Sequence, residues 1–141
     1  MAQRARADGD LRRIFRKYLP QVHWVSIETG ACAPGTPDSN YCTRGVEGWI
    51  EYKQTTGRSV TLRPMQIAWL DKRGREGGRV LVAVRRRTAD TDELWLLDGA
   101  KAREIRRAGL DISKSYTLGV WFGGPSLWPW GDVLSVLVTI R

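Results

Sequence analysis

The sequence predicts one α/β domain over residues 1–141, built on a mixed β-sheet of about four or five strands flanked by α-helices. The length of 141 residues matches the usual size of a single domain. Stretches with helical spacing alternate with short apolar stretches along the chain, which is typical of layered α/β folds. A strand, a helix and a buried strand also follow one another between residues 48 and 84, and this order indicates a parallel crossover.

The first expected element is an amphipathic helix over about residues 8–19. Asp8 or Asp10 can cap its start, and Pro20 ends it. The apolar positions recur at helical spacing at Leu11, Ile14, Phe15, Tyr18 and Leu19. The other face carries Arg12, Arg13, Arg16 and Lys17, and it is either solvated or turned toward a polyanion.

Three strands are expected next. The first covers residues 22–28, and a loop over 29–36 that is rich in Gly and Pro returns the chain. The second covers residues 39–42. The third, over 48–54, is bounded by Gly48 and by the turn at 55–57, and its Trp, Ile and Tyr are typical strand residues.

A helix over about residues 64–75 follows, because Pro64 suits the first helical turn and Gly77-Gly78 closes the helix. Residues 79–84 are nearly all apolar, which predicts a strand buried on both faces of the sheet.

The C-terminal part predicts a short strand at 93–97 and a helix from Asp98-Gly99 to about Ala108. Residues 119–130 are rich in Gly, Pro and Trp and are expected to form a loop. Its aromatic side chains either pack this Trp-rich extension (about 110–141) onto the core or stack on bases. Residues 133–140 form a final core helix or strand.

The central strand carries two charges where an interior strand usually has none. Side chains alternate along a strand, so Glu51 and Lys53 share a face and lie about 7 Å apart. Asp38 offers a second carboxylate. Two carboxylates can hold Mg²⁺, which takes its other ligands from water and phosphate, and a nearby amine can stabilise a charged transition state. An exposed ion pair on an edge strand would give the same pattern.

Pro37-Asp38, twelve intervening residues and Glu51-x-Lys53 resemble the signature of the PD-(D/E)xK nuclease superfamily. The helix beginning near Pro64, with Gln66 beside the site, is similar to the helix of the Holliday-junction-resolvase-like and VRR-NUC-like branches. The resemblance runs from about residue 22 to residue 84. It implies a restriction-endonuclease-like core in which Asp38 and Glu51 bind metal, Lys53 acts in catalysis and Gln66 positions the site.

The resemblance also implies a further acidic residue that reaches the metal. Asp10 on the first helix is one candidate, although as an N-cap it already has a structural explanation. Glu28, at the end of the first predicted strand, is the other. The expected cofactor is Mg²⁺, for which Mn²⁺ should substitute.

DNA is the expected partner. The chain has 23 Lys and Arg against 15 Asp and Glu, a net charge of +8 that favours polyanions. A GC-rich genome, which inflates arginine content, is the alternative explanation. Arg85, Arg86 and Arg87 follow the buried strand and are candidates for phosphate contacts, or else a solvated basic run.

Other function classes are disfavoured. Cys32, Cys42 and His23 are the only residues of their types, too few for a four-ligand zinc site or for histidine-based triads. No apolar run reaches the length of a membrane span, and the basic N-terminus lacks the apolar core of a signal peptide. We therefore expect a cytoplasmic protein without a membrane partner.

The sequence thus predicts a Mg²⁺-dependent endodeoxyribonuclease that is selective for DNA structure. The resemblance implies a phage or bacterial Holliday junction resolvase that acts as a homodimer and leaves a 5′-phosphate and a 3′-hydroxyl. A homing, restriction or repair endonuclease on the same fold is the alternative among enzymes. A non-catalytic DNA-binding module is the rival from another class.

Overall fold

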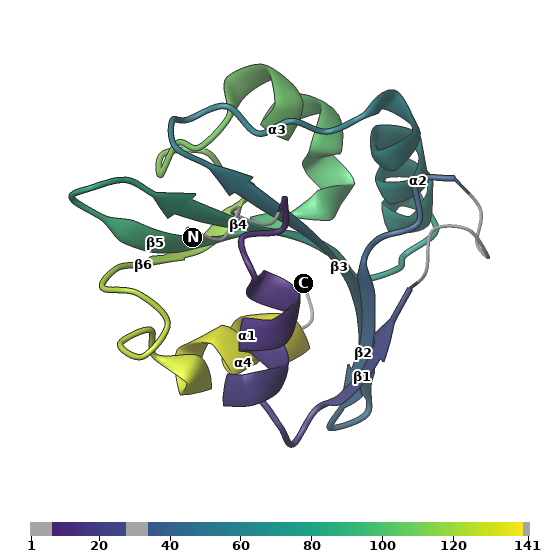
Figure 1. The fold of residues 1–141 in the computed structure, drawn as a ribbon. Coiled ribbons are helices and arrows are strands. Elements are labelled where there is room, and N and C mark those ends of the chain that lie inside the picture. Colours follow the sequence, from purple (N-terminus) through teal and green to yellow (C-terminus); the bar gives the residue numbers. More distant parts are fainter. Residues whose placement is uncertain (1–6, 28–33, 140–141) are drawn as a thin grey trace.

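The computed structural model describes residues 7–27 and 34–139. These ranges form an α/β fold with six strands in one mixed sheet, four α-helices and one short 3-10 helix (Figure 1). The elements in chain order are α1 (Leu11–Tyr18), β1 (His23–Ser26), β2 (Ser39–Thr43), β3 (Val46–Thr55), α2 (Pro64–Arg75), β4 (Val80–Arg87), β5 (Asp92–Asp98), η2 (Gly99–Lys101), α3 (Ala102–Ala108), β6 (Thr117–Trp121) and α4 (Trp130–Val138). The predicted α/β class, a mixed sheet flanked by helices, is confirmed, but the sheet has six strands rather than the predicted four or five.

The strands lie in the sheet in their sequence order, from β1 to β6. Neighbouring strands are antiparallel except β3 and β4, which are parallel and connected through α2. The predicted parallel crossover is therefore confirmed. Where β3 pairs with β4, Glu51 lies opposite Val82 and Lys53 opposite Val84, so the charged positions of β3 lie in the middle of the sheet.

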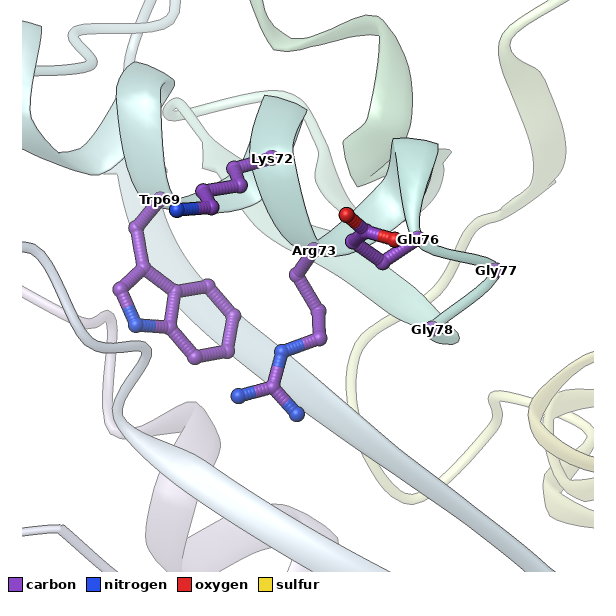
Figure 2. Close-up of a pocket in the computed structure, with 6 residues that line it drawn as sticks. All are labelled: Trp69, Lys72, Arg73, Glu76, Gly77 and Gly78. Carbon is purple, nitrogen blue, oxygen red and sulfur yellow. The ribbon is translucent and has the colours of Figure 1, made fainter.

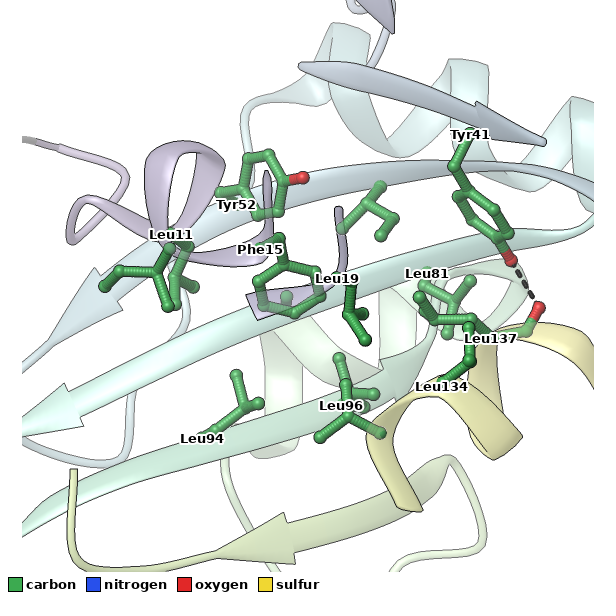
Figure 3. Packing of buried hydrophobic residues seen from close by; sticks show 14 of the residues in the cluster. Leu11, Phe15, Leu19, Tyr41, Tyr52, Leu81, Leu94, Leu96, Leu134 and Leu137 are labelled. Atoms are coloured by element: carbon green, nitrogen blue, oxygen red, sulfur yellow. Dashed lines mark hydrogen bonds between the residues drawn. The ribbon is translucent and has the colours of Figure 1, made fainter. Parts of the chain in front are cut away.

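Helices cover both faces of the sheet (Figure 1). On one face α1 and α4 enclose an apolar cluster that includes Phe15, Tyr41 and Leu137, and Figure 3 shows the Tyr41 hydroxyl donating a hydrogen bond of 2.6 Å to the Leu137 carbonyl. On the other face Leu70 of α2 and Ile105 of α3 pack with Val82 of β4 in a second apolar cluster. Side chains of β3 therefore alternate between two separate hydrophobic layers.

The helices are short, and α2 has the bounds that the sequence predicts, Pro64–Arg75 (12 residues). Among the residues described, no helix is long and apolar enough to cross a membrane.

The first helix begins later than expected, at Leu11. Asp10 occupies its N-cap position in a left-handed conformation with φ +62°, and its side chain makes no capping hydrogen bond.

The Trp-rich C-terminal segment is anchored to the core. Trp128 is only 2% exposed, and the ring of Trp130 stacks on Tyr18 at 5.0 Å between centroids. These contacts confirm core packing for the two tryptophans and remove them as base-stacking candidates. The predicted start of the loop over 119–130 is too early in the chain, because residues 117–121 form β6, which pairs with β5. The last predicted element, which the sequence left open as a helix or a strand, is the helix α4.

Candidate active site

The candidate active site is centred on Glu51, in the middle of β3. The neighbouring Ile50 and Tyr52 point into the cluster under α1 and α4, so Glu51 faces the α2 layer. Glu51 is 3% exposed, although a carboxylate is rarely buried unless it is paired. The lysine two residues later shares this face, with its Nζ 3.6 Å from Glu51 Oε2. The pair is therefore mostly buried, unlike an exposed ion pair on an edge strand.

Asp38 lies beside Glu51, at the start of the neighbouring strand β2. Its Oδ2 accepts a hydrogen bond of 2.9 Å from the backbone N–H of Tyr52, and its Oδ1 lies 3.6 Å from Arg12 Nη2. The Asp38 carboxyl group lies close enough to Glu51 to raise the pKa of Glu51 by charge repulsion. The structure thus brings together the two carboxylates that the sequence singled out.

Gln66, in the first turn of α2, connects the acidic and the basic side chain. Its Nε2 donates a hydrogen bond of 2.9 Å to Glu51 Oε2, and its Oε1 accepts one of 3.0 Å from Lys53 Nζ. The same Oε1 also accepts the backbone N–H of Arg63 at 3.0 Å. These bonds fix the amide orientation, so the position of Lys53 depends on α2 as well as on β3.

The protonation of Glu51 reflects this crowding. Burial, followed by the adjacent Asp38 carboxyl group, raises the pKa of Glu51 from 4.5 to about 8, and Lys53 offsets part of the rise. Burial and the neighbouring carboxyl group thus both favour the protonated form of Glu51. A divalent cation between the two carboxylates would relieve the same repulsion and would displace that proton.

A pocket of about 620 Å³ opens over these side chains. Its lining also includes Asp8, and Met65, which is 59% exposed, lies at its rim. Asp10, which the sequence offered as a metal ligand, does not line this pocket. It lines a separate basic hollow together with Asp8, Arg12, Arg13 and Arg16. Glu28, the rival candidate, lies outside the described residues.

The sequence did not predict that Asp8 lines the pocket, because the position of Asp8 depends on the backbone that follows it. Gly9 and Asp10 both adopt left-handed conformations with φ +62°, and Asp8 Oδ1 accepts the Asp10 backbone N–H at 3.0 Å. The Gly9 carbonyl in turn accepts a hydrogen bond of 2.9 Å from Arg85 Nη1. This turn carries Asp8 to the pocket, and the only hint in the sequence is a Gly next to two Asp residues.

The carboxylates fit a magnesium site. Mg²⁺ prefers oxygen ligands and is commonly held by one or two carboxylates, with water and substrate phosphate completing its coordination. Asp38 and Glu51 offer two such side chains at the pocket. Across residues 7–27 and 34–139, no three His, Cys, Asp or Glu side chains gather into a group that could hold a metal ion.

The three consecutive arginines belong to β4 rather than to the segment after it. Arg85 has a side chain only 7% exposed, which bonds both carboxylate oxygens of Asp92 at 2.8 and 2.6 Å. We therefore assign Arg85 to the fold and withdraw it as a DNA contact. Arg86 pairs with Glu93 at 2.7 Å but is 26% exposed, and it stays a candidate together with Arg87.

Comparisons with known proteins add no assignment: no protein-family model matches the sequence, and no curated protein matches it significantly. The case for a function therefore depends on the residues of the pocket and on the motif they form.

Proposed function

We propose that this chain is a Mg²⁺-dependent endodeoxyribonuclease with a restriction-endonuclease-like core, and that it cleaves DNA according to its structure, as Holliday junction resolvases do. The observation that carries the proposal is the adjacent carboxyl pair, the buried Glu51 and the partly exposed Asp38, with Lys53 held beside Glu51 by Gln66. Placing two acidic groups side by side, one of them buried, costs stability. A fold retains such an arrangement when the pair binds a cation.

Each side chain has a distinct part in the proposed reaction. Asp38 and Glu51 would hold the ion, and a bound Mg²⁺ would polarise the phosphodiester and lower the pKa of a coordinated water. Lys53, 3.0 Å from Gln66 Oε1, directs its ammonium group toward the pocket side of Glu51, where it can orient the attacking water and neutralise charge on the pentavalent phosphorus. Gln66 fixes the orientation of both partners. Water adds to phosphorus and the 3′ oxygen leaves, which yields a 5′-phosphate and a 3′-hydroxyl.

The pocket is consistent with a polyanionic substrate. Arg63 on its rim, Lys53 inside it and the net charge of +8 favour phosphate binding. A homodimer would place two such pockets on the two strands of a junction, and we propose this form by analogy with the resolvases that the motif resembles. The restriction, homing and repair alternatives use the same chemistry and differ in the DNA that they accept.

A cleavage assay on a panel of DNAs tests the proposal. Linear duplex, flapped duplex and four-way junctions are incubated with the protein in Mg²⁺, in Mn²⁺ and in EDTA, and the ends are mapped. We expect cuts in both metals, none in EDTA, and a preference for the branched substrates. Glu104→Gln, an exposed carboxylate change on α3, is the matched control and should cut normally. Binding by gel shift without any cut in either metal would favour the non-catalytic module instead.

A further inference from the structure

A second hollow, of about 560 Å³, lies at the C-terminal half of α2, and the proposed reaction does not use it. Figure 2 shows the Trp69 indole and the Arg73 guanidinium side by side at its centre, with Lys72 above and Glu76 beyond. Its lining residues are Trp69, Lys72, Arg73, Glu76, Gly77 and Gly78. An aromatic ring, two cations, one carboxylate and two glycines thus share one open surface, and the cations outnumber the carboxylate.

Arg73 is held in place by ring contacts. Its guanidinium carbon lies 4.7 Å from the centroid of the Trp69 ring and 5.5 Å from that of Trp49, and the two rings meet edge to face at 5.3 Å. A Cβ on Gly78 would come within 2.6 Å of Arg73 Cδ, so the glycine makes room for the arginine side chain. The planar group is therefore positioned before any ligand arrives.

The charge of Arg73 is not neutralised within the described part of the chain, where no carboxylate lies within ion-pair distance of it. Arg75, two residues later, differs in this respect because its Nη2 lies 3.2 Å from Asp71 Oδ2. Arg73 can therefore give its hydrogen-bond donors to an incoming anion while its plane rests on the indole.

The hollow continues the candidate active site along the same two elements. Trp49 precedes Glu51 by two residues on the same face of β3, a separation of about 7 Å. Trp69 follows Gln66 by three residues in α2, a rise of about 4.5 Å. A nucleic-acid strand that placed a phosphate at Glu51 and Lys53 would therefore reach the Trp69 and Arg73 surface within one or two nucleotides.

We propose that this hollow binds an unpaired nucleotide of the DNA strand, with the base against the Trp69–Arg73 pair and its phosphate at Arg73 and Lys72. Aromatic rings and guanidinium planes stack on the face of a base, and that face is covered by neighbouring bases in an intact duplex. The site therefore selects DNA with a single-stranded segment near the scissile phosphate. The location of that phosphate rests on the proposed function, whereas the binding of single strands does not.

Binding is measured in EDTA, so that cleavage plays no part. The probes are a fluorescently end-labelled single-stranded oligonucleotide of mixed sequence and its blunt duplex, followed by anisotropy. We expect Trp69→Ala and Arg73→Ala to weaken single-strand binding roughly tenfold to a hundredfold, the range for losing one stacked base. Duplex binding should change by less than about threefold, since one phosphate contact is one among many. Trp69→Phe, which keeps a ring, should retain most of the single-strand affinity.

Two control variants accompany these changes. Arg75→Ala removes a cation from the same helix, and Phe122→Ala removes a 60% exposed ring elsewhere on the surface. Both should bind single strands like the parent protein. If Trp69→Ala does not fold, the exposed Arg73→Ala carries the test alone. Equal losses on single strand and duplex, or no loss on either, would overturn the proposal.

The same variants separate this inference from the proposed function. On a flapped duplex in Mg²⁺, Arg73→Ala should lose its preference over linear duplex while still cutting. A protein that cuts with unchanged preference refutes the second site and leaves the nuclease standing. A protein that never cuts, but binds single strands through Trp69 and Arg73, refutes the nuclease and supports the site.

Discussion

Gln66 Nε2 donates a hydrogen bond of 2.9 Å to Glu51 Oε2, while the Oε1 of the same amide accepts one of 3.0 Å from Lys53 Nζ. One side chain of α2 thus orients both charged groups of β3. Because the amide has a donor end and an acceptor end, it can serve the two partners at once. The geometry of the candidate site therefore depends on the packing of α2 against the sheet.

Gln66→Ala should lower the single-turnover cleavage rate by roughly tenfold to a hundredfold, the usual cost of losing a group that orients a metal ligand. DNA affinity in EDTA should change little, because Gln66 carries no charge. The comparison is with Arg75→Ala, on the same helix but outside the pocket, which should cut at the parent rate. A Gln66→Ala protein whose rate is unaltered would show that the bridge has no part in catalysis.

Lys53→Ala should lower the rate by about a hundredfold or more, the scale for losing a positioned charge-stabilising group. Lys53→Arg should not restore it, because a planar guanidinium cannot occupy the place of an ammonium hydrogen-bonded to Gln66. Single-turnover rates at saturating protein and fixed Mg²⁺ measure both variants. Full activity in Lys53→Ala would remove the lysine from the mechanism.

The raised pKa of Glu51 makes folding stability depend on pH. Below pH 4.5 the group is protonated in both the folded and the unfolded protein, and its contribution to stability is fully present. As pH rises to about 8 the unfolded chain ionises first, so the free energy of unfolding falls by roughly 5 kcal/mol. Urea unfolding of the parent and Glu51→Gln across this window should show the loss in the parent alone. Added Mg²⁺ should restore stability mainly at the high-pH end, and parallel pH profiles would contradict the assignment.

Arg85→Ala should destabilise the fold by about 3 kcal/mol, because it leaves the Asp92 carboxylate and the Gly9 carbonyl without their buried partner. Arg75→Ala removes an exposed pair and should cost less than about 1 kcal/mol. Denaturant unfolding of both variants measures the difference. Equal, small effects would return Arg85 to the candidates for DNA contacts.

Local patterns predicted the parts of the fold that local chemistry decides. Pro64 and Gly77 mark the ends of α2, and the alternation of β3 places Glu51 and Lys53 on one face. The strand β6 was missed because Gly119 and the following Gly- and Pro-rich residues resemble a loop. Its strand character comes from pairing with β5, a long-range contact that composition does not encode.

The candidate site was likewise predictable only where the residue types themselves indicate it. Glu51 stands out because a carboxylate is unusual in mid-strand, and Asp38 because Pro37-Asp38 with Glu51-x-Lys53 resembles a known motif; the structure places the two side chains close together. Asp8 did not stand out, because a left-handed backbone at Gly9 and Asp10 decides where it lies. The role of Arg85 was hidden for a related reason, since its partner Asp92 is on the next strand.

The measurement that tests the central claim most directly is cleavage and binding by Glu51→Gln and Asp38→Asn, with Glu104→Gln as the control. We expect that both pocket variants fold and bind branched DNA in EDTA at least as tightly as the parent, because neither substitution adds negative charge beside the phosphate. Both should lose cleavage in Mg²⁺, because each removes a carboxylate ligand of the ion. A folded Glu51→Gln protein that cuts at close to the parent rate would contradict it.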